Sequence, residues 1–419
     1  MRCDGKAGCA GYGGGVDTRR RDPWRLRGQL VVLAMAFTVA AVLVADSRGP
    51  FAGGGAPGAG APGAGAAGAG SEVDPGAPAL PAGASTMTTP PVTTAPPATT
   101  SPASATAPPE GDGEPIRLAF AGDVHFEGEL ATALAADPAG MLAPIAPVLS
   151  SADLAVVNVE TAITTGGTPS AKQYNFRAPP SALEALRSAG VDVASLANNH
   201  GLDYGVEGLS DSLAAAEEAG LPLIGIGRDE AEAYAPHVAT LGVRTVAVIG
   251  ATQVLDGSLI ASWTAGPDQP GLASAKRVDR LVEEVRATRA VADTVVVYLH
   301  WGVEKATCPS EDQQQLARTL VDAGADIVVG GHAHRLQGAG RLDGALVAYG
   351  LGNFVFYARG GPASDSGVLI VTVDGRDVLG HEWIPAVIQG GIPRPLDGPD
   401  AQRAVAAFDD LRSCTGLDP

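Results

Sequence analysis

Short polar motifs that contain histidine follow several apolar runs of this chain. Five of its seven histidines lie in such motifs, which are Gly122-Asp123-Val124-His125, Asn198-Asn199-His200, His300-Trp301-Gly302-Val303-Glu304 and Gly331-His332-Ala333-His334. Imidazole, carboxylate and carboxamide groups at successive strand ends can converge on one point. A pair of divalent metal ions would use all of these donors at once. The motifs therefore predict a metal site.

The spacing within each motif suggests how the donors would be presented. Asp123 and His125 lie two residues apart, so an extended backbone would point both side chains to the same side, and we expect the same of His332 and His334. Glu160 follows Asn158-Val159, and its carboxylate could bridge two ions that lie about 3.5–4 Å apart. Asn199 and His300 would add a carbonyl oxygen and a nitrogen. Any one of these motifs alone is more typical of a hydrogen-bonded turn, but their joint occurrence at strand ends favours a metal site.

The elements that must position these motifs alternate between strands and helices. Apolar runs, many of them β-branched, predict buried strands at residues 116–121, 153–158, 191–196, 244–249, 294–299, 326–329 and 346–349. Helical patterns occupy residues 181–189, 205–219, 274–290 and 311–323, and Gly190, Gly220 and Gly324 stand just past three of them. This alternation predicts an α/β fold, and two consecutive runs at 367–373 and 378–388 predict a second, partly antiparallel sheet.

The N-terminal quarter of the chain predicts attachment to a membrane. Residues 1–28 form a basic tail, and the predicted membrane segment at 29–46, which is uncharged up to Ala45, follows it, so the positive-inside rule places the N-terminus in the cytoplasm. A single-pass transmembrane signal anchor is the preferred interpretation, and a signal peptide cleaved after Ala45 is the alternative. Residues 47–113 consist mostly of Gly, Ala, Pro, Ser and Thr, which predicts a disordered linker. The folded domain would then lie on the outer side of the cell membrane.

The rest of the chain is long enough for one large domain with a substantial core, predicted at residues 114–395 and followed by a C-terminal helix or tail at 396–419. The whole chain carries a net charge of −18, and residues 1–48 carry eight Lys/Arg against four Asp/Glu, so the remainder carries −22. A domain this acidic is a poor general binder of nucleic acid, so we expect no nucleic-acid partner.

The four cysteines divide between the two sides of the predicted membrane segment. Cys3 and Cys9 precede it, whereas Cys308 and Cys414 fall in the predicted exported part, where a disulfide is allowed. A Cys308–Cys414 bridge and two unpaired thiols are both compatible with the sequence. The chain has no Cys-x-x-Cys, so we do not expect cysteine ligands.

Taken together, the motifs resemble the CapA (PgsA) family of capsule and poly-γ-glutamate biosynthesis proteins, which is related to the calcineurin-like metallophosphoesterases. The matching stretches span residues 116–388 and are Gly-Asp-Val-His, Asn-Val-Glu, Leu-Ala-Asn-Asn-His-Gly-Leu-Asp-Tyr-Gly, His-Trp-Gly-Val-Glu, Asp-Ala-Gly-Ala-Asp-Ile-Val-Val-Gly-Gly-His-Ala-His and Tyr-Gly-Leu-Gly-Asn-Phe-Val-Phe. The resemblance implies a four-layer αββα metallophosphatase-like sandwich with two divalent metal ions, which would be Mn, Fe or Zn.

The resemblance also implies a role for each site residue. Asp123, His125 and His334 would hold the first ion. Asn199, His300 and His332 would hold the second, and Glu160 would bridge the two. His200 would act beside the ions as general acid or electrostatic stabiliser, oriented by Asp203. Glu304 and Asn353 lie in matching motifs without an implied ligand role, and a turn amide that caps a loop is the simplest interpretation of Asn353.

Two classes of function are compatible with these expectations. The first is a metal-dependent hydrolase that acts on a phosphoester or an amide, either within capsule synthesis or unrelated to it. The second is a non-catalytic accessory component of a polymer-export assembly, in which the metals serve binding or stability. The resemblance implies polyglutamate polymer and capsule synthase subunits as partners in a capsule-linked role.

Overall fold

The computed structural model describes residues 113–419. The predicted cytoplasmic tail, the predicted membrane segment and all of the predicted linker except Gly113 lie outside the described residues. Within residues 113–419, no helix has the length and apolar character that a membrane crossing requires.

The first sheet has eight strands and begins with the run that carries the first motif. Its strands lie in the order β18-β17-β16-β1-β2-β5-β6, and β15 also pairs with β1. Their bounds are Ile116–Val124 (β1), Leu154–Val159 (β2), Val193–Ser195 (β5), Leu223–Ile224 (β6), Asn353–Val355 (β15), Asp365–Asp374 (β16), Asp377–Gln389 (β17) and Ile392–Pro395 (β18). Strands β1, β2, β5 and β6 are parallel, and β16 to β18 are antiparallel to their neighbours.

The second sheet has six strands and comes from the middle of the chain. Its order is β13-β14-β12-β11-β9-β8, with bounds His237–Leu241 (β8), Arg244–Thr252 (β9), Thr294–His300 (β11), Ile327–Gly331 (β12), Leu336–Leu342 (β13) and Ala345–Leu351 (β14). The four inner strands are parallel, and β8 and β13 are antiparallel edges. The smaller two-stranded pairs are Ala162–Ile163 (β3) with Arg177–Ala178 (β4), and Ile226–Gly227 (β7) with Gly271–Leu272 (β10).

The predicted sheet membership of the last two long strands is wrong. The runs at 367–373 and 378–388 do form consecutive antiparallel strands, β16 and β17, but they extend the first sheet instead of building a second one. Strand β16 pairs along the edge of β1 that β2 leaves open, from Ile116 opposite Val373 to Ala121 opposite Val368. Apolar periodicity indicates that a segment is a strand, but the choice of partner depends on which edge is left unpaired in the assembled fold.

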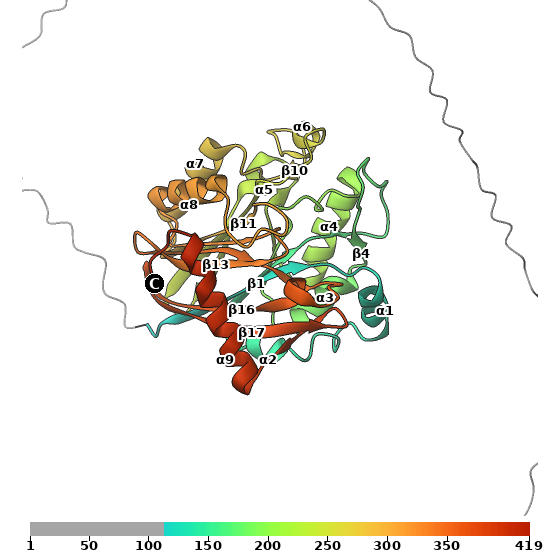
Figure 1. The fold of residues 1–419 in the computed structure, drawn as a ribbon. Helices are drawn as coiled ribbons and strands as arrows, with labels where there is room; N and C mark the ends of the chain where they lie inside the picture. The colour runs from blue at the N-terminus through green and yellow to red at the C-terminus, as the bar shows by residue number, and fades with distance from the viewer. Residues whose placement is uncertain (1–112) are drawn as a thin grey trace, which may run out of the picture. The chain divides into compact units, whose positions relative to one another are not determined.

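Three apolar clusters define the layers of a sandwich. Side chains alternate along β1, so that Leu118 and Phe120 lie between the two sheets, whereas Ala119 and Ala121 face the helices on the outer side. The outer face of the first sheet is covered by Glu129–Ala136 (α1), Ala146–Leu149 (α2), Ser181–Ser188 (α3) and Gly205–Ala219 (α4). The outer face of the second sheet is covered by Val278–Arg289 (α7) and Glu311–Ala323 (α8), which lie side by side (Figure 1). Residues 113–419 thus form a mixed α/β sandwich of two sheets between helical layers.

The helix predictions agree with the structure in position; the C-terminal ends of α3 and α7 differ by one residue, and the start of α7 differs by four. Two helices, α4 and α8, have the predicted bounds, and both end at a glycine in the left-handed conformation, Gly220 and Gly324. Helix α7 begins at Val278 instead of Ser274, because Ser274 forms a β-bridge to Thr252 before the helix starts. The remaining helices are Glu230–Tyr234 (α5), Ile260–Trp263 (α6), Gly398–Asp410 (α9) and the 3-10 turns Gly361–Ala363 (η1) and Leu411–Cys414 (η2).

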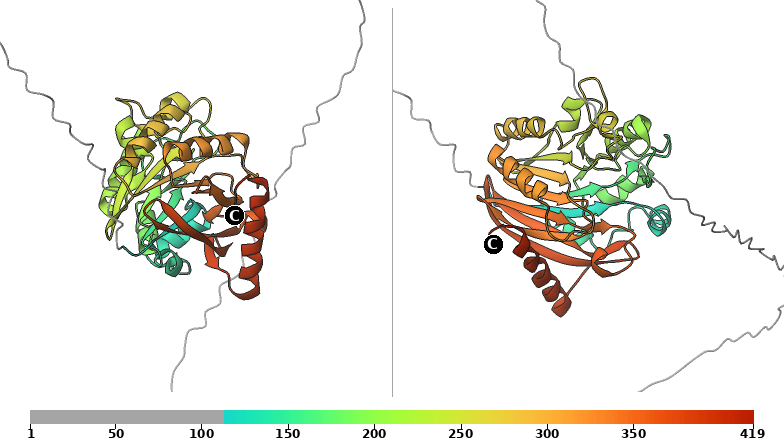
Figure 2. Two further views of the ribbon diagram at one scale, coloured as in Figure 1. Left: turned by 90° about the vertical axis from the view of Figure 1, so that its left-hand side faces the viewer. Right: turned by 45° about the horizontal axis from the view of Figure 1, so that its top comes forward.

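The C-terminal residues close one side of the sandwich. Helix α9, dark red in Figure 2, lies against β17 and β13, so it contacts a strand of each sheet. Phe408 of α9 stacks on Trp383 at 4.2 Å between ring centroids and belongs to the cluster between the sheets. The Cys308–Cys414 disulfide joins η2 to the loop after β11, which settles the alternative that the sequence left open. The chain-entropy model gives about 4–5 kcal/mol of stabilisation for a loop of 106 residues.

Candidate metal centre

The polar motifs meet because the parallel strands of both sheets end on the same side. Asp123 lies opposite Asn158 in the first sheet, and His300 lies opposite Gly331 in the second. Strands β1 and β12 contact each other across the sandwich, so the two sets of strand ends are adjacent. A Cβ atom on Gly331 would lie 2.3 Å from Asp123 Oδ1. Glycine at this position therefore permits the close approach of the two sheets at the site.

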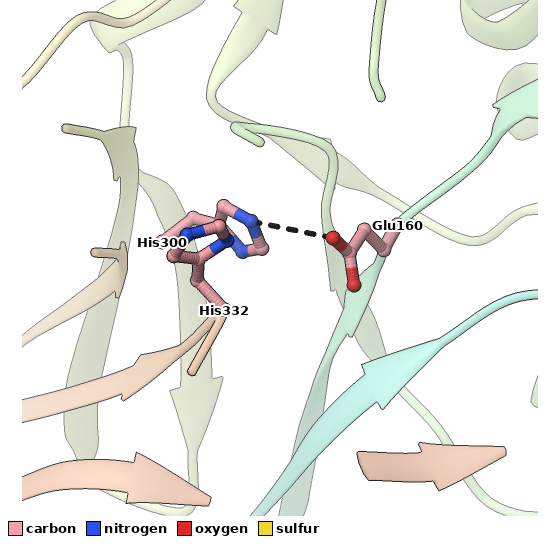
Figure 3. Close-up of side chains that lie close together, drawn as sticks. All are labelled: Glu160, His300 and His332. Carbon is pink, nitrogen blue, oxygen red and sulfur yellow. Dashed lines mark ion pairs between the residues drawn. The ribbon is translucent and has the colours of Figure 1, made fainter. Parts of the chain in front are cut away.

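Two groups of donor atoms lie close enough together to hold a cation. One consists of Asp123, Glu160 and His334, and the other of Glu160, His300 and His332; within each group, the ligand atoms all lie within 4.8 Å of one another. Glu160 belongs to both groups, which is the arrangement that a bridging carboxylate requires. Figure 3 shows His300 and His332 on one side and Glu160 facing them across the site.

Distances around Glu160 leave room for an ion between the donors. Its Oε1 lies 3.5 Å from His300 Nε2 and 3.9 Å from both His334 Nε2 and His200 Nε2. These separations are too long for hydrogen bonds. Two ligand atoms that each lie about 2.0–2.2 Å from a shared ion would be separated from each other by a distance close to these 3.5–3.9 Å. Asn199 lies next to the second group, since its Oδ1 is within hydrogen-bond distance, 2.7 Å, of His300 Nε2.

The donors fit a metal ion because several of them lack other partners. Glu160 is 1% exposed, and neither of its carboxylate oxygens has a hydrogen-bond partner among the described residues. The Nδ1 atom of His332 is also buried without a partner among those residues. A buried carboxylate without partners is strongly destabilising unless a cation compensates it. Imidazole nitrogens and carboxylate oxygens are the donors that Mn, Fe and Zn accept.

Neighbouring charges adjust the protonation of the site. Burial alone would raise the pKa of Asp123, but the hydrogen bond and charge of His334 outweigh it and lower that pKa to about 2. Burial alone would lower the pKa of His334, but Glu160 and Asp123 raise it to about 10. Burial also lowers the pKa of His300 to about 3 and that of His332 to about 4. His300 and His332 are therefore neutral at pH 7, which is the form of imidazole that binds metals, whereas His334 is protonated in the metal-free protein and would lose its proton on binding an ion.

The two histidines after β12 reach the site in a different way from the predicted one. Both have positive φ, 92° for His332 and 52° for His334, so the expectation of an extended backbone there is wrong. The left-handed conformation turns the chain at each histidine, and the main-chain N–H of His332 donates to Asp123 Oδ2 at 3.0 Å. Residues other than glycine rarely adopt this conformation, and such strain is concentrated at functional sites.

His125 lies beside the two donor groups and belongs to neither of them in the described structure. Its Nδ1 lies 3.1 Å from the main-chain nitrogen of Glu127, and its ring packs against Phe176 at 5.2 Å and Phe356 at 4.1 Å. Burial, followed by the charge of His334, lowers the pKa of His125 to about 3. Its ring is therefore neutral and close to the site, but the contacts that hold it are made with the main chain and aromatic rings.

His200 and Asp203 form a close pair at the rim of the site. The Nδ1 atom of His200 lies 2.6 Å from Asp203 Oδ2, and the Nε2 atom on the other side of the ring faces Glu160. Phe176 stacks on the His200 ring at 4.2 Å between centroids. The carboxylate and the aromatic ring together fix the orientation of the imidazole.

Two buried asparagines, not singled out from the sequence, link the ligand strands. Asn158 Nδ2 donates to Asp123 Oδ1 at 2.8 Å and lies 3.1 Å from His300 Nδ1, so it connects a carboxylate and an imidazole from different sheets. Asn198 Nδ2 donates to Asn158 Oδ1 at 3.0 Å. Both residues lie inside the motifs quoted above. Their position beside the predicted ligands was the sequence signal that could have identified them. The motifs alone do not separate such supporting residues from ligands.

Asn353 and Glu304, for which no ligand role was expected, have different environments. Asn353 Nδ2 donates to the main-chain oxygen of Ala363 at 2.9 Å, as the predicted turn amide would. Its Oδ1 also lies 2.8 Å from His334 Nδ1, so it orients a candidate ligand as well. Glu304 is exposed in the loop after β11.

These features define the class of the protein. It is a two-sheet α/β sandwich in which histidines and carboxylates cluster at the strand ends. A model of the family described as bacterial capsule synthesis protein PGA_cap matches residues 117–358, and the chain belongs to this family. The match includes all nine of the predicted metal and catalytic residues.

Curated relatives agree with this assignment. The chain is 33% identical over 229 residues to the capsule biosynthesis protein CapA of Bacillus anthracis, which covers 54% of each chain. It is 29% identical over 256 residues to the PGA biosynthesis protein CapA of Bacillus subtilis, covering 60% of this chain and 66% of the relative. It is 30% identical over 213 residues to a probable polyglutamine synthesis accessory protein of Mycobacterium tuberculosis, covering 49% of this chain and 56% of the relative. The chain thus spans between half and two thirds of the length of these relatives.

Solved structures with a similar fold include enzymes. A phosphatase from Mycoplasma pneumoniae has a TM-score of 0.41 and 16% sequence identity, covering 69% of this chain and 97% of that one. A putative 5'-nucleotidase from Staphylococcus aureus also has a TM-score of 0.41, with 17% identity, covering 71% of this chain and 58% of that one. Similarity at this level is too distant to assign an activity.

Proposed function

We propose that this chain is a metal-dependent hydrolase that acts outside the cell in the synthesis of a capsular polymer of the poly-γ-glutamate type. The observation that carries the catalytic part is Glu160, a fully buried carboxylate without a hydrogen-bond partner among the described residues, which faces imidazoles from both sheets. Membership of the capsule synthesis family supports the capsular role.

The chain's own residues would hold two divalent ions. Asp123, Glu160 and His334 would bind one ion, and Glu160, His300, His332 and Asn199 would bind the other. His125 remains a predicted ligand of the first ion. Bound cations in such a pair make a water molecule more acidic and stabilise negative charge on a phosphoryl oxygen.

His200 would act as the general acid. Since Asp203 carries a carboxylate that can only accept, His200 Nδ1 donates to it, and the Nε2 atom that faces the site is free to carry a second proton to a leaving group. Asp203 and the stacked ring of Phe176 would hold the imidazole in this orientation throughout. A phosphoester is the preferred substrate class, and an amide is the alternative.

The extracytoplasmic location rests on two lines of support. The predicted membrane anchor at residues 29–46 would place the domain outside, as would a cleaved signal peptide. The Cys308–Cys414 disulfide is consistent with an oxidising compartment. The growing polymer and the subunits of its synthase are the partners that this location would provide.

A non-catalytic accessory role is the second candidate. It is favoured by the name of the Mycobacterium tuberculosis relative, which describes an accessory protein. In this case the metals would stabilise the fold or bind the polymer, and His200 would have no effect on turnover. A phosphoesterase unrelated to capsule synthesis would have the same site and a different substrate.

Metal content is the first test. The full-length chain, purified in detergent after expression with added Mn, Fe and Zn, should contain about two ions per chain by elemental analysis. His237→Ala serves as the matched control, because His237 lies on β8 outside both donor groups, and it should leave the content unchanged. Absence of metal from the wild-type protein would contradict the proposal.

Activity with two leaving groups separates the two candidates. A nitrophenyl phosphoester needs little protonation of its leaving group, whereas an alkyl phosphoester needs a general acid. His200→Ala should lower kcat on the alkyl ester by about 10²–10⁴-fold, with a smaller loss on the nitrophenyl ester and unchanged metal content. A metal-loaded wild-type protein without turnover on phosphoesters, amides or γ-glutamyl polymer would favour the accessory role.

A further inference from the structure

One lysine is buried at the rim of the candidate metal centre. Lys172 lies on the loop that joins β3 to β4, and its side chain is 8% exposed. The loop is fastened to the turn after β5, since Ser170 N donates to the main-chain oxygen of Asp203 at 2.8 Å and Ser170 Oγ donates to that of Leu202 at 3.1 Å. An ammonium group in such a place needs compensating partners, because burial of an unpaired charge is costly.

The ammonium of Lys172 lies 3.3 Å from His200 Nδ1 and has three further partners. It lies 2.6 Å from Asp203 Oδ1, and it donates a hydrogen bond to the main-chain oxygen of Asn199. It also lies 5.1 Å from the centre of the Trp263 ring, within the range of a cation–π contact. The Lys172 ammonium thus contacts the main chain of Asn199, a candidate metal ligand, and the carboxylate of Asp203, which orients the candidate general acid His200.

The surroundings of Asp203 show what this contact accomplishes. Its Oδ2 accepts from the main-chain N–H of Phe176 at 2.6 Å and from His200 Nδ1 at 2.6 Å, while its Oδ1 faces Lys172. The carboxylate is therefore held on both sides and cannot rotate without breaking a contact. Without Lys172, Oδ1 would lose its cation, and the turn that carries Asn199 and His200 would lose one of its several links to the β3–β4 loop.

We propose that Lys172 is a positioning residue that fixes two functional groups at once. One is the side-chain Oδ1 of Asn199, which would bind the second ion, and the other is the imidazole ring of His200. This inference rests on the metal centre proposed above. Lys172 does not touch the reacting atoms, and it acts through the Asn199 main chain, through Asp203 and through its own contact with His200 Nδ1.

Cobalt binding tests the proposal at the metal. The full-length chain is freed of metal and titrated with Co²⁺, and the visible absorption spectrum and the dissociation constants are recorded for wild type, Lys172→Met and Lys276→Met. Lys276→Met is the matched control, because it removes the same charge from an exposed position. Lys172→Met should weaken the binding of one of the two ions by about 10–100-fold and change its absorption bands, as loss of an outer partner of a ligand does. A spectrum and dissociation constants equal to those of the control would overturn the proposal.

Hydrogen exchange tests the positioning without any metal. In the metal-free full-length chain, Lys172→Met should speed amide exchange about tenfold in peptides that cover residues 198–204, with little change in the helices on the outer faces. Exchange that is equally fast throughout the protein would indicate general destabilisation and contradict a local role. If the wild-type chain binds no cobalt, the proposed metal centre is wrong, and this measurement alone decides whether Lys172 holds the turn.

A double-mutant cycle tests the route through Asp203. If Lys172 acts on His200 through this carboxylate, Lys172→Met and Asp203→Asn should be non-additive in the protection of residues 198–204, the turn that carries His200, from amide exchange, so that the double variant resembles the more severe single variant. Additive losses would show that Lys172 acts independently of Asp203 and would overturn that part of the proposal.

Discussion

Carboxylates lie at both ends of the parallel strands, the amino edge and the carboxyl edge, but their surroundings differ between the two. At the amino ends of the parallel strands, four aspartates each stand immediately before a strand and accept the main-chain N–H of a residue on the neighbouring strand. They are Asp153, Asp192, Asp293 and Asp326, and they accept from Arg117, Ala155, Thr245 and Val295, respectively, at 2.7–2.8 Å. At the carboxyl ends, Glu160 has no hydrogen-bond partner among the described residues.

The difference separates carboxylates that have partners within the chain from a candidate metal ligand in the same fold. Asp326 is 5% exposed and Glu160 is 1% exposed, so burial alone does not separate them. Asp326 receives a main-chain N–H and faces Arg289 and Arg376, which together offset its desolvation. Glu160 faces imidazoles at distances too long for hydrogen bonds. A carboxylate whose partners are all present stabilises the sheet, whereas one that lacks them points to a ligand that the chain itself does not supply.

Glu160→Gln should give the largest effect, and this effect should be confined to metal binding at the carboxyl edge. The variant removes the charge shared by both donor groups, so both ions should bind more than about 100-fold more weakly, beyond what loss of an outer partner costs. The metal-free protein should unfold at no lower urea concentration than wild type, because a buried charge has been removed. Metal titration and urea unfolding of the same samples check both parts. A clear loss of metal-free stability would mean that Glu160 is structural after all.

Asp326→Ala, at the amino edge, should lower the stability of the protein and leave its metal binding unchanged. Removing this carboxylate leaves the main-chain N–H of Val295 and the guanidinium of Arg289 without their buried partner, so the free energy of unfolding should fall by about 2–4 kcal/mol. The metal content should stay at the wild-type value, since the site lies at the opposite ends of the strands. Loss of metal at a temperature where the variant is still folded would show that the two edges are not independent.

Gly331→Ala should disturb the carboxyl edge without changing any ligand. The new methyl group would lie 2.3 Å from Asp123 Oδ1, so the carboxylate or the strand must shift. We expect a loss of about 1–3 kcal/mol in stability from this overpacking, together with weaker metal binding. Gly257→Ala is the control, because nothing lies within 4 Å of the added atom there. If Gly331→Ala binds metal as wild type does, the close approach at Asp123 has no functional consequence.

The carboxyl edge could be predicted from the sequence much better than the amino edge. The motifs place Asp123, Glu160 and His300 at strand ends, and parallel strands bring those ends together, so convergence follows from topology. The left-handed backbone at His332 and His334 could not be predicted, because it depends on contacts such as that of the His332 N–H with Asp123. The support from Lys172 likewise depends on how a loop folds over a distant turn.

At the amino edge, the predicted strands start one or two residues too early, because the aspartates directly precede the apolar runs. Asp153, Asp192 and Asp326 were predicted as the first or second residues of strands, whereas the strands begin just after them, at Leu154, Val193 and Ile327. Apolar periodicity does not specify which residue is the first to pair. The main-chain N–H groups that these aspartates accept become available only when the neighbouring strand is in register.

Asp153→Ala should have the smallest effect. It shows how far burial changes the contribution of an aspartate–main-chain hydrogen bond to the free energy of unfolding. Asp153 accepts from Arg117 at 2.8 Å, nearly the same geometry as Asp326 with Val295, but it is exposed to solvent. Water can replace the carboxylate at Arg117, so the free energy of unfolding should fall by less than about 1 kcal/mol, against the larger loss in Asp326→Ala. Urea unfolding of the two variants in one buffer measures the difference. Equal losses would mean that the contact stabilises the sheet by fixing its register, which does not depend on burial. A larger loss in Asp326→Ala would mean that the contribution depends on burial of the contacts that Asp326 makes, including its ion pair with Arg289.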